Sequence, residues 1–124
     1  MNIIFGPVPD EVLQKYTVLE LDTFVDSQKR IATAWCVLET IPLAELLNLS
    51  SQLELHSRLL EQYRKRNWEY CQDALNYLQG KWNREVDSFY DIFSERIKDL
   101  MLQDLPESWS GFLPVADHIS NSSL

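Results

Sequence analysis

The chain of 124 residues has few of the residues on which most catalytic and metal sites depend. It contains two cysteines, two histidines and three glycines. Cys36 and Cys71 lack the spacing of a metal site, and so few glycines form no phosphate-binding loop. No serine or cysteine has a base partner placed by the sequence pattern. We therefore expect no catalytic residue, no metal site and no cofactor.

Basic residues are scarce as well. Eleven Lys and Arg stand against nineteen Asp and Glu, which gives a net charge of −8. A surface that binds nucleic-acid phosphates needs clustered Lys and Arg, so we expect no direct contact with nucleic acid. A basic protein partner fits this charge, and an acidic inhibitor that mimics DNA remains an open alternative.

Long apolar runs are absent too. The longest, residues 41–49, contains Pro42 and Glu45 and is far shorter than the roughly 20 residues that span a bilayer. The N-terminus lacks the basic and apolar regions of a secretion signal. We therefore expect a cytoplasmic protein without membrane contact, in which Cys36 and Cys71 stay reduced.

The C-terminal half has the periodicity of three helices. Asn67 is a preferred N-cap before one apolar stripe, and Gly80 ends that helix. A second helix is expected from its N-cap Asn83 to Pro106, and an earlier one begins at Ser50 and Ser51. The short connections predict antiparallel neighbours. The three apolar stripes are Leu49, Leu53, His56, Leu60 and Tyr63; Trp68, Cys71, Leu75 and Leu78; and Val86, Phe89, Tyr90, Phe93, Ile97, Leu100 and Met101.

The N-terminal half has the period of two that is typical of strands. Residues 17–25 alternate, and residues 31–39 are rich in β-branched and aromatic side chains. A hairpin closed by residues 26–30 would pair Val25 with Ile31, Leu21 with Trp35, and Leu19 with Val37.

Prolines and a glycine restrict the first nine residues to an extended arm or a short edge strand. Asp10 is expected to begin a short helical turn through Tyr16. We thus predict one α+β domain over residues 1–115, an antiparallel β-hairpin packed on a three-helix antiparallel bundle, with a third strand left open. Residues 116–124 are expected to be a flexible C-terminal tail. Exposed sheet edges leave a homo-oligomer open.

Two groups of polar residues could carry chemistry. His56 lies on an apolar stripe without a second histidine at ligand spacing, so we favour a core histidine over a base or ligand. Glu20 and Asp22 could bind a divalent ion or act in acid–base chemistry together with another carboxylate. We favour their pairing with Lys or Arg from a neighbouring helix.

Three consecutive bases, Arg64, Lys65 and Arg66, end the first long helical pattern. A site for acidic groups is one interpretation. We favour the other, in which these side chains satisfy the helix end and its loop.

Aromatic residues are more numerous than a small core needs. Tyr70, Ala74 and Tyr77 form a second apolar stripe on the helix 67–80, and a helix apolar on two sides is either central or at an interface. Residues 106–115 are apolar but irregular, and we expect them to pack on the helices, although a partner could use them instead. The residues that we predict to bind a partner are Trp109, Phe112, Leu113, Tyr70 and Tyr77.

The segments YTVLELDTF, TAWCVLETIPL, NWEYC and GKWNREVDSFY resemble short uncharacterised proteins of contractile-tailed phages from marine cyanobacteria and other marine bacteria. This resemblance spans nearly the full length and implies no activity. Residues 16–113 are also similar to the C-terminal extension of bacterial class III adenylate and guanylate cyclases, without their catalytic core. The tail pattern of that extension is matched by Tyr63, Trp68, Ala74, Asp87, Arg96, Pro106, Trp109 and Gly111.

These observations predict a non-enzymatic protein-interaction or regulatory module that is phage-encoded and acts on a host or phage protein in the host cytosol. Two other functions stay open. One is a remnant of a cyclase that binds a nucleotide or small ligand, and the other is the acidic DNA mimic.

Overall fold

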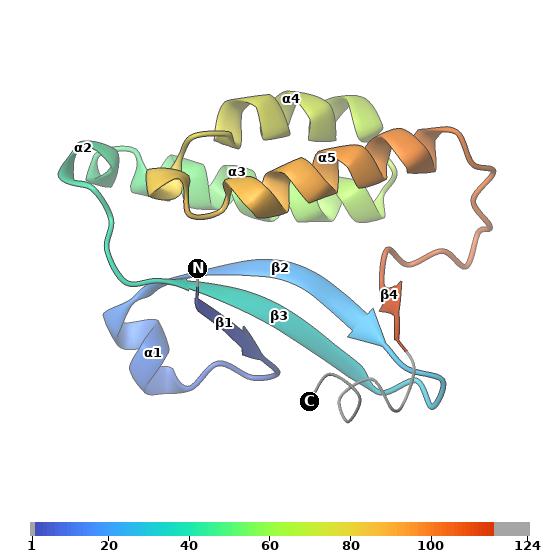
Figure 1. The fold of residues 1–124 in the computed structure, drawn as a ribbon, viewed down its shortest axis with the longest axis horizontal. Helices are drawn as coiled ribbons and strands as arrows, with labels where there is room; N and C mark the ends of the chain where they lie inside the picture. Colours follow the sequence, from blue (N-terminus) through green and yellow to red (C-terminus); the bar gives the residue numbers. More distant parts are fainter. Residues whose placement is uncertain (1, 116–124) are drawn as a thin grey trace.

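A computed structural model shows an α+β fold and describes residues 2–115. Met1 and the predicted tail, residues 116–124, lie outside the described residues. Figure 1 shows the elements in chain order: β1 (Asn2–Phe5), α1 (Asp10–Lys15), β2 (Thr17–Val25), β3 (Ile31–Leu38), α2 (Leu43–Leu46), α3 (Leu49–Arg64), α4 (Trp68–Leu78), the 3-10 helix η1 (Trp82–Arg84), α5 (Asp87–Met101) and β4 (Leu113–Pro114).

The described strands form one sheet in the order β1-β3-β2-β4. The predicted hairpin is β2 and β3, and the N-terminal arm adds β1 as an antiparallel edge strand beside β3. The two-residue strand β4 was not predicted. It pairs in parallel with the end of β2, where Phe24 stands opposite Leu113 and Val25 opposite Pro114.

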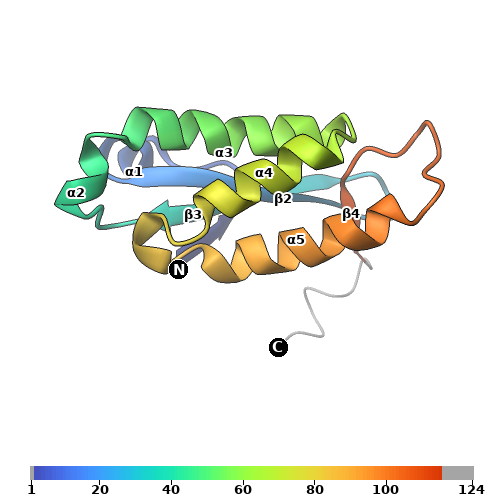
Figure 2. The same ribbon diagram turned by 90° about the horizontal axis from the view of Figure 1, so that it is seen from above.

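The sheet, the pair α3 and α5, and the helix α4 form three successive layers. Helices α3 and α5 lie over one face of the sheet, and α4 lies over both of them on the side away from the sheet (Figures 1 and 2). The short helix α1 lies on the opposite face of the sheet. Because α3, α4 and α5 run in alternating directions, the predicted antiparallel three-helix arrangement is confirmed, and α4 is its outermost member.

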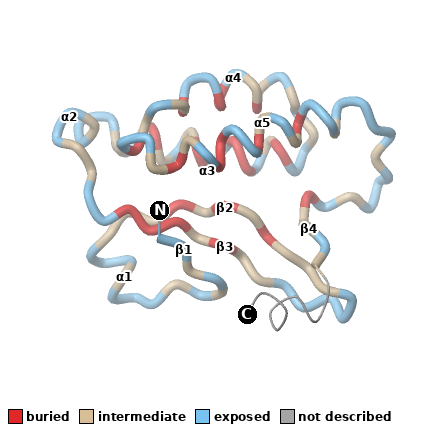
Figure 3. The backbone as a smooth tube through the Cα atoms, in the orientation of Figure 1, coloured by how far each residue is buried: buried red, intermediate tan, exposed pale blue. Residues whose placement is uncertain are grey.

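Buried residues are concentrated in β2, β3, α3, α4 and α5, as Figure 3 shows. Leu19, Cys36 and Leu38 come from the sheet, and Leu60, Leu78 and Tyr90 are among the buried members of the three predicted stripes. Leu59 is also buried although it was in no predicted stripe, and Met101 of the third stripe is exposed. Each large apolar side chain that is fully buried contributes about 1.5–3 kcal/mol. The core therefore confirms the helical periodicity.

The hairpin register differs from the prediction on one side of a β-bulge. Val25 pairs with Ile31 as expected, but Glu20 pairs with Trp35 and Leu19 with Cys36, so two of the expected pairs are wrong. Leu21 and Asp22 lie together between the pairs that flank them, where β3 supplies only Ala34. One extra residue in a strand shifts every later pair by one position.

Asn83 is not the N-cap of α5, contrary to the prediction. It lies in a left-handed turn with Trp82 and Arg84, whose φ angles are 55°, 52° and 64° in sequence order, and α5 begins at Asp87. Left-handed backbone costs roughly 1–2 kcal/mol per residue. The fully buried indole of Trp82 offsets this cost.

The other helix starts are closer to expectation. Asn67 caps α4, since its Oδ1 accepts from the backbone N–H of Tyr70 at 3.5 Å. Helix α3 begins at Leu49 after Asn48, one residue before the predicted serines. Helix α1 begins at Asp10, as predicted.

Candidate functional site

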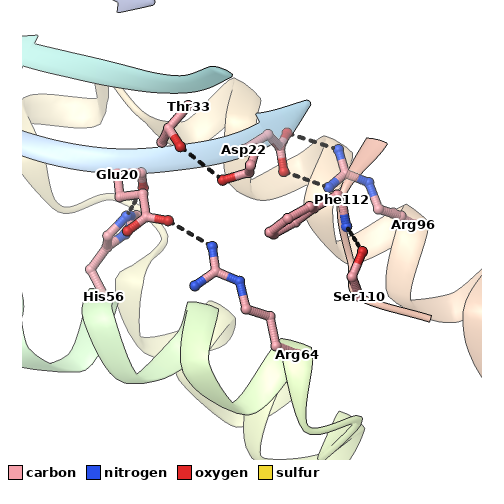
Figure 4. A network of polar contacts seen from close by, with 9 residues as sticks. Glu20, Asp22, Thr33, His56, Arg64, Arg96, Ser110 and Phe112 are labelled. Carbon is pink, nitrogen blue, oxygen red and sulfur yellow. Dashed lines mark hydrogen bonds and ion pairs between the residues drawn. The ribbon is translucent and has the colours of Figure 1, made fainter. Parts of the chain in front are cut away.

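A network of polar contacts joins the middle of β2 to α3 and α5, and Figure 4 shows the part of it formed by Glu20, Asp22, His56, Arg64 and Arg96. His56 is 2% exposed. Its Nε2 lies 2.5 Å from the carbonyl oxygen of Glu20, and its Nδ1 lies 2.9 Å from the hydroxyl of Tyr90. Trp82 donates from Nε1 to the same hydroxyl at 2.9 Å.

These partners fix the direction of every hydrogen bond around His56. The carbonyl of Glu20 only accepts, so Nε2 carries the proton, and neutral Nδ1 accepts from Tyr90. Tyr90 in turn accepts from Trp82. Burial lowers the pKa of His56, which favours this neutral form. The arrangement confirms the core histidine.

Glu20 and Asp22 pair with arginines on two helices, as the favoured interpretation predicted. Arg96 of α5 donates to both carboxylate oxygens of Asp22 at 2.8 and 3.1 Å, and Arg64 of α3 donates to Glu20 at 2.6 Å (Figure 4). Within residues 2–115, no group of three or more His, Cys, Asp or Glu side chains could hold a metal ion.

The three consecutive bases at the end of α3 form contacts with three different parts of the chain. Arg64 reaches Glu20, and Lys65 pairs with Glu61 at 3.1 Å. Arg66 donates to the carbonyls of Leu105 and Pro106. All three bases thus have partners within the chain, but only Lys65 pairs within the end of α3, so the prediction for the helix end and its loop holds only in part.

The irregular segment packs back on the helices, as expected. The Trp109 ring makes edge contacts with Tyr63 and Trp68 at centroid distances of 5.3 and 5.7 Å, and the Arg66 guanidinium lies 5.4 Å from its centroid. The backbone N–H of Phe112 donates to Ser110. Leu113 belongs to β4. These predicted partner-binding residues are thus engaged within the chain.

The other two predicted residues line an open hollow of about 300 Å³ between α3 and α4. We call it the α4 groove, and its lining residues are Leu55, Tyr70, Asp73, Ala74 and Tyr77. Tyr77 is 57% exposed, and Ala74 is buried. Neither tyrosine hydroxyl forms a hydrogen bond to any described residue. The groove therefore has an apolar floor and two tyrosine hydroxyls without a hydrogen-bond partner among the described residues.

Sequence reasoning found part of this groove and missed the rest. Tyr70, Ala74 and Tyr77 were visible as a stripe, and Asp73 lies one residue off it. Leu55 lies beside the core stripe of α3, and its spacing gives no sign that it contacts the outer helix. Only the packing of α4 on α3 brings Leu55 into the groove.

The two thiols lie in the core. Burial raises the pKa of Cys36 and of Cys71 to about 11, so neither is a ready nucleophile near neutral pH.

Among the helices of residues 2–115, none combines the length and the apolar character that a bilayer crossing requires.

Comparison with known proteins gives no match to a protein-family model, a curated protein or a solved structure. The resemblances to marine phage proteins and to the cyclase extension stay predictions. Interpretation of the site therefore depends on its geometry.

Proposed function

We propose that the protein is a non-enzymatic protein-interaction module that docks a partner in the α4 groove. One observation carries this proposal: the helix with two apolar stripes is the outermost helix of the fold (Figure 2). Its first stripe, which includes Cys71 and Leu78, is buried in the core. The second stripe lines the groove: Ala74 is buried, Tyr70 is partly buried against the core, and Tyr77 is exposed, so a partner would bury mainly the Tyr77 ring.

The groove favours a protein over a phosphate-bearing ligand. Its lining contains two tyrosines, a leucine and an alanine, and its one charged member is the carboxylate of Asp73. Aromatic side chains are enriched at the centres of protein interfaces, where Tyr contributes both apolar area and a hydroxyl. A nucleotide would need cationic groups beside its phosphates, and the only charged lining residue is the carboxylate of Asp73, which would repel them.

The partner is proposed to be a host or phage protein in a bacterial cytosol. This part depends on the resemblance to proteins of marine contractile-tailed phages. An extract of a marine bacterium that such phages infect is accordingly the first source in which to seek the partner.

The test compares two single variants as baits in that extract. Tyr77→Arg fills the groove with a long charged side chain, whereas Ile92→Arg introduces the same side chain at a residue of α5 with 60% exposure. Both variants are first checked for wild-type unfolding curves. We expect a protein captured by the wild type and by Ile92→Arg but not by Tyr77→Arg. Equal capture by all three baits would refute the groove as the interface.

A further inference from the structure

We propose that the α4 groove binds a basic amphipathic α-helix of the partner protein. This inference names the class of partner for the proposed function and depends on it. It follows from the shape of the groove and from the distribution of charge around it.

The shape of the groove suits a helix. Tyr70, Asp73, Ala74 and Tyr77 follow one another at intervals of three, one and three residues, so they form a straight row along α4. Leu55 of α3 forms the opposite side. The row from Tyr70 to Tyr77 is about 10 Å long at 1.5 Å per residue, which matches about two turns of a partner helix laid along it. Helices that dock in this way insert side chains spaced i, i+3, i+4 and i+7.

The charge around the groove is unbalanced. Helix α4 contains Glu69 and Asp73 but no Lys or Arg. Both carboxylates are exposed, lie one turn apart, and form no ion pair with the described residues. Helix α3, by contrast, pairs Glu54 with Arg58 at 2.6 Å and Glu61 with Lys65. Cations on the partner would therefore meet uncompensated negative charge on the α4 side.

One aromatic ring of the groove already has a cation beside it. The Nζ of Lys81 is 5.1 Å from the centroid of the Tyr77 ring. Such a contact is electrostatically attractive, and it shows that this aromatic wall accepts a positive charge. A Lys or Arg flanking the apolar stripe of a partner helix would find the same kind of contact.

Charge argues against a second copy of this chain as the occupant. Pairing two copies through α4 would bring Glu69 and Asp73 of both chains together, and each chain has a net charge of −8. Like charges placed opposite each other across an interface are unfavourable. A basic helix removes this repulsion.

The experiment selects peptides from a displayed library of about 18 residues, long enough for three turns and their flanks. The full chain is the target, and Tyr77→Arg is the counter-selection target. We expect survivors with apolar residues at i, i+3, i+4 and i+7 and with Lys or Arg beside that stripe. Survivors that are acidic, uncharged or proline-rich would overturn the inference.

The affinity of the best peptide for charge-neutralised variants then tests whether Glu69 and Asp73 contribute to binding. The double variant Glu69→Gln/Asp73→Asn should weaken binding by about threefold to twentyfold, since each exposed ion pair contributes up to about 1 kcal/mol. The control Asp99→Asn/Asp104→Asn makes the same change in net charge outside the groove and should change affinity less than twofold. Equal effects of the two double variants would overturn the inference.

The two proposals can fail separately. If the extract yields a protein that depends on Tyr77 but the library yields no basic helix, the partner class is wrong and the proposed function stands. If neither yields anything that depends on Tyr77, both proposals fail. Self-association that Tyr77→Arg abolishes, measured by sedimentation, would assign the groove to a second copy and overturn the inference.

Discussion

Tyr90 donates a hydrogen bond to Nδ1 of His56 over 2.9 Å, and this bond links α5 to α3 in the interior of the protein. The hydroxyl also accepts from Trp82, and the other nitrogen of His56 donates to the carbonyl of Glu20. Every donor in this series of hydrogen bonds, from Trp82 to the carbonyl of Glu20, has an acceptor when His56 is neutral. Protonation of Nδ1 would leave two donors directed at the Tyr90 hydroxyl and its own hydrogen without an acceptor.

Stability should therefore fall on mild acidification. Burial lowers the pKa of His56 in the folded state, while the unfolded chain titrates near 6.5. The unfolded state thus binds the proton first, so the stabilisation is complete above about pH 6.5 and is lost as the pH falls below it. Urea unfolding from pH 7.5 to 5.5 should show a decrease that approaches 1.4 kcal/mol per pH unit at most. The variant His56→Gln should lack this decrease, and a wild-type curve that stays flat would contradict the assignment.

Removing the Tyr90 hydroxyl should destabilise the protein without changing its shape. In Tyr90→Phe, the Trp82 N–H and His56 Nδ1 both lose their partner in the core, which costs about 1–3 kcal/mol. Tyr70→Phe is the matched control because its hydroxyl has no bond to a described residue. The control should lie within about 0.5 kcal/mol of wild type in urea unfolding. Similar losses in both variants would show that the bond to His56 is not the cause.

The ion pair between Asp22 and Arg96 should couple more strongly than the exposed pairs. Its side chains are 14% and 18% exposed, and Arg96 donates to both carboxylate oxygens. A double-mutant cycle with alanine should give a coupling of about 1–3 kcal/mol. The same cycle on Glu54 and Arg58, an exposed pair within α3, should give about 0.5 kcal/mol or less. Equal couplings would mean that solvent screens both pairs alike.

Gly111 should tolerate alanine less well than Gly6. Both have left-handed backbone, with φ of 82° and 86°, so both variants share the conformational cost of about 1 kcal/mol. A Cβ at Gly111 would also lie 3.0 Å from Cε2 of Tyr63, while nothing lies within 4 Å at Gly6. In urea unfolding, the free energy of unfolding of Gly111→Ala should therefore be lower than that of Gly6→Ala by about 1 kcal/mol. Equal losses of stability in the two variants would show that the Tyr63 ring moves aside without cost, despite its contact with Trp109.

The sequence predicted the helices and the hairpin because their signals are local. Apolar spacing identified α3, α4 and α5, and Asn67 correctly marked the start of α4. The N-cap predicted at Asn83 was wrong because Asn is common both at N-caps and in left-handed backbone. Here the turn that buries Trp82 places Asn83 in left-handed backbone. The bulge at Leu21 and Asp22 has no sequence signal of its own. It places Asp22 within reach of Arg96, and that partner is 74 residues away along the chain.

The groove illustrates the same limit at the level of function. A second stripe on α4 was visible, but periodicity alone leaves a central helix and an interface helix equally possible. The order of the layers excludes a central position, since α4 lies outside α3 and α5 (Figure 2), and the interface is our proposal. Trp109 shows the reverse case. An apolar residue in an irregular segment suggested a partner, and the structure places it against Tyr63 and Trp68.

Photo-crosslinking from position 77 tests the central claim most directly. Tyr77→benzoylphenylalanine places the reactive group in the groove, and Ile92→benzoylphenylalanine places it on α5 at similar exposure. After irradiation in the bacterial extract, we predict a crosslink from position 77 to one protein and none to that protein from position 92. The same crosslinks from both positions, or none from position 77, would contradict a docking site in the α4 groove.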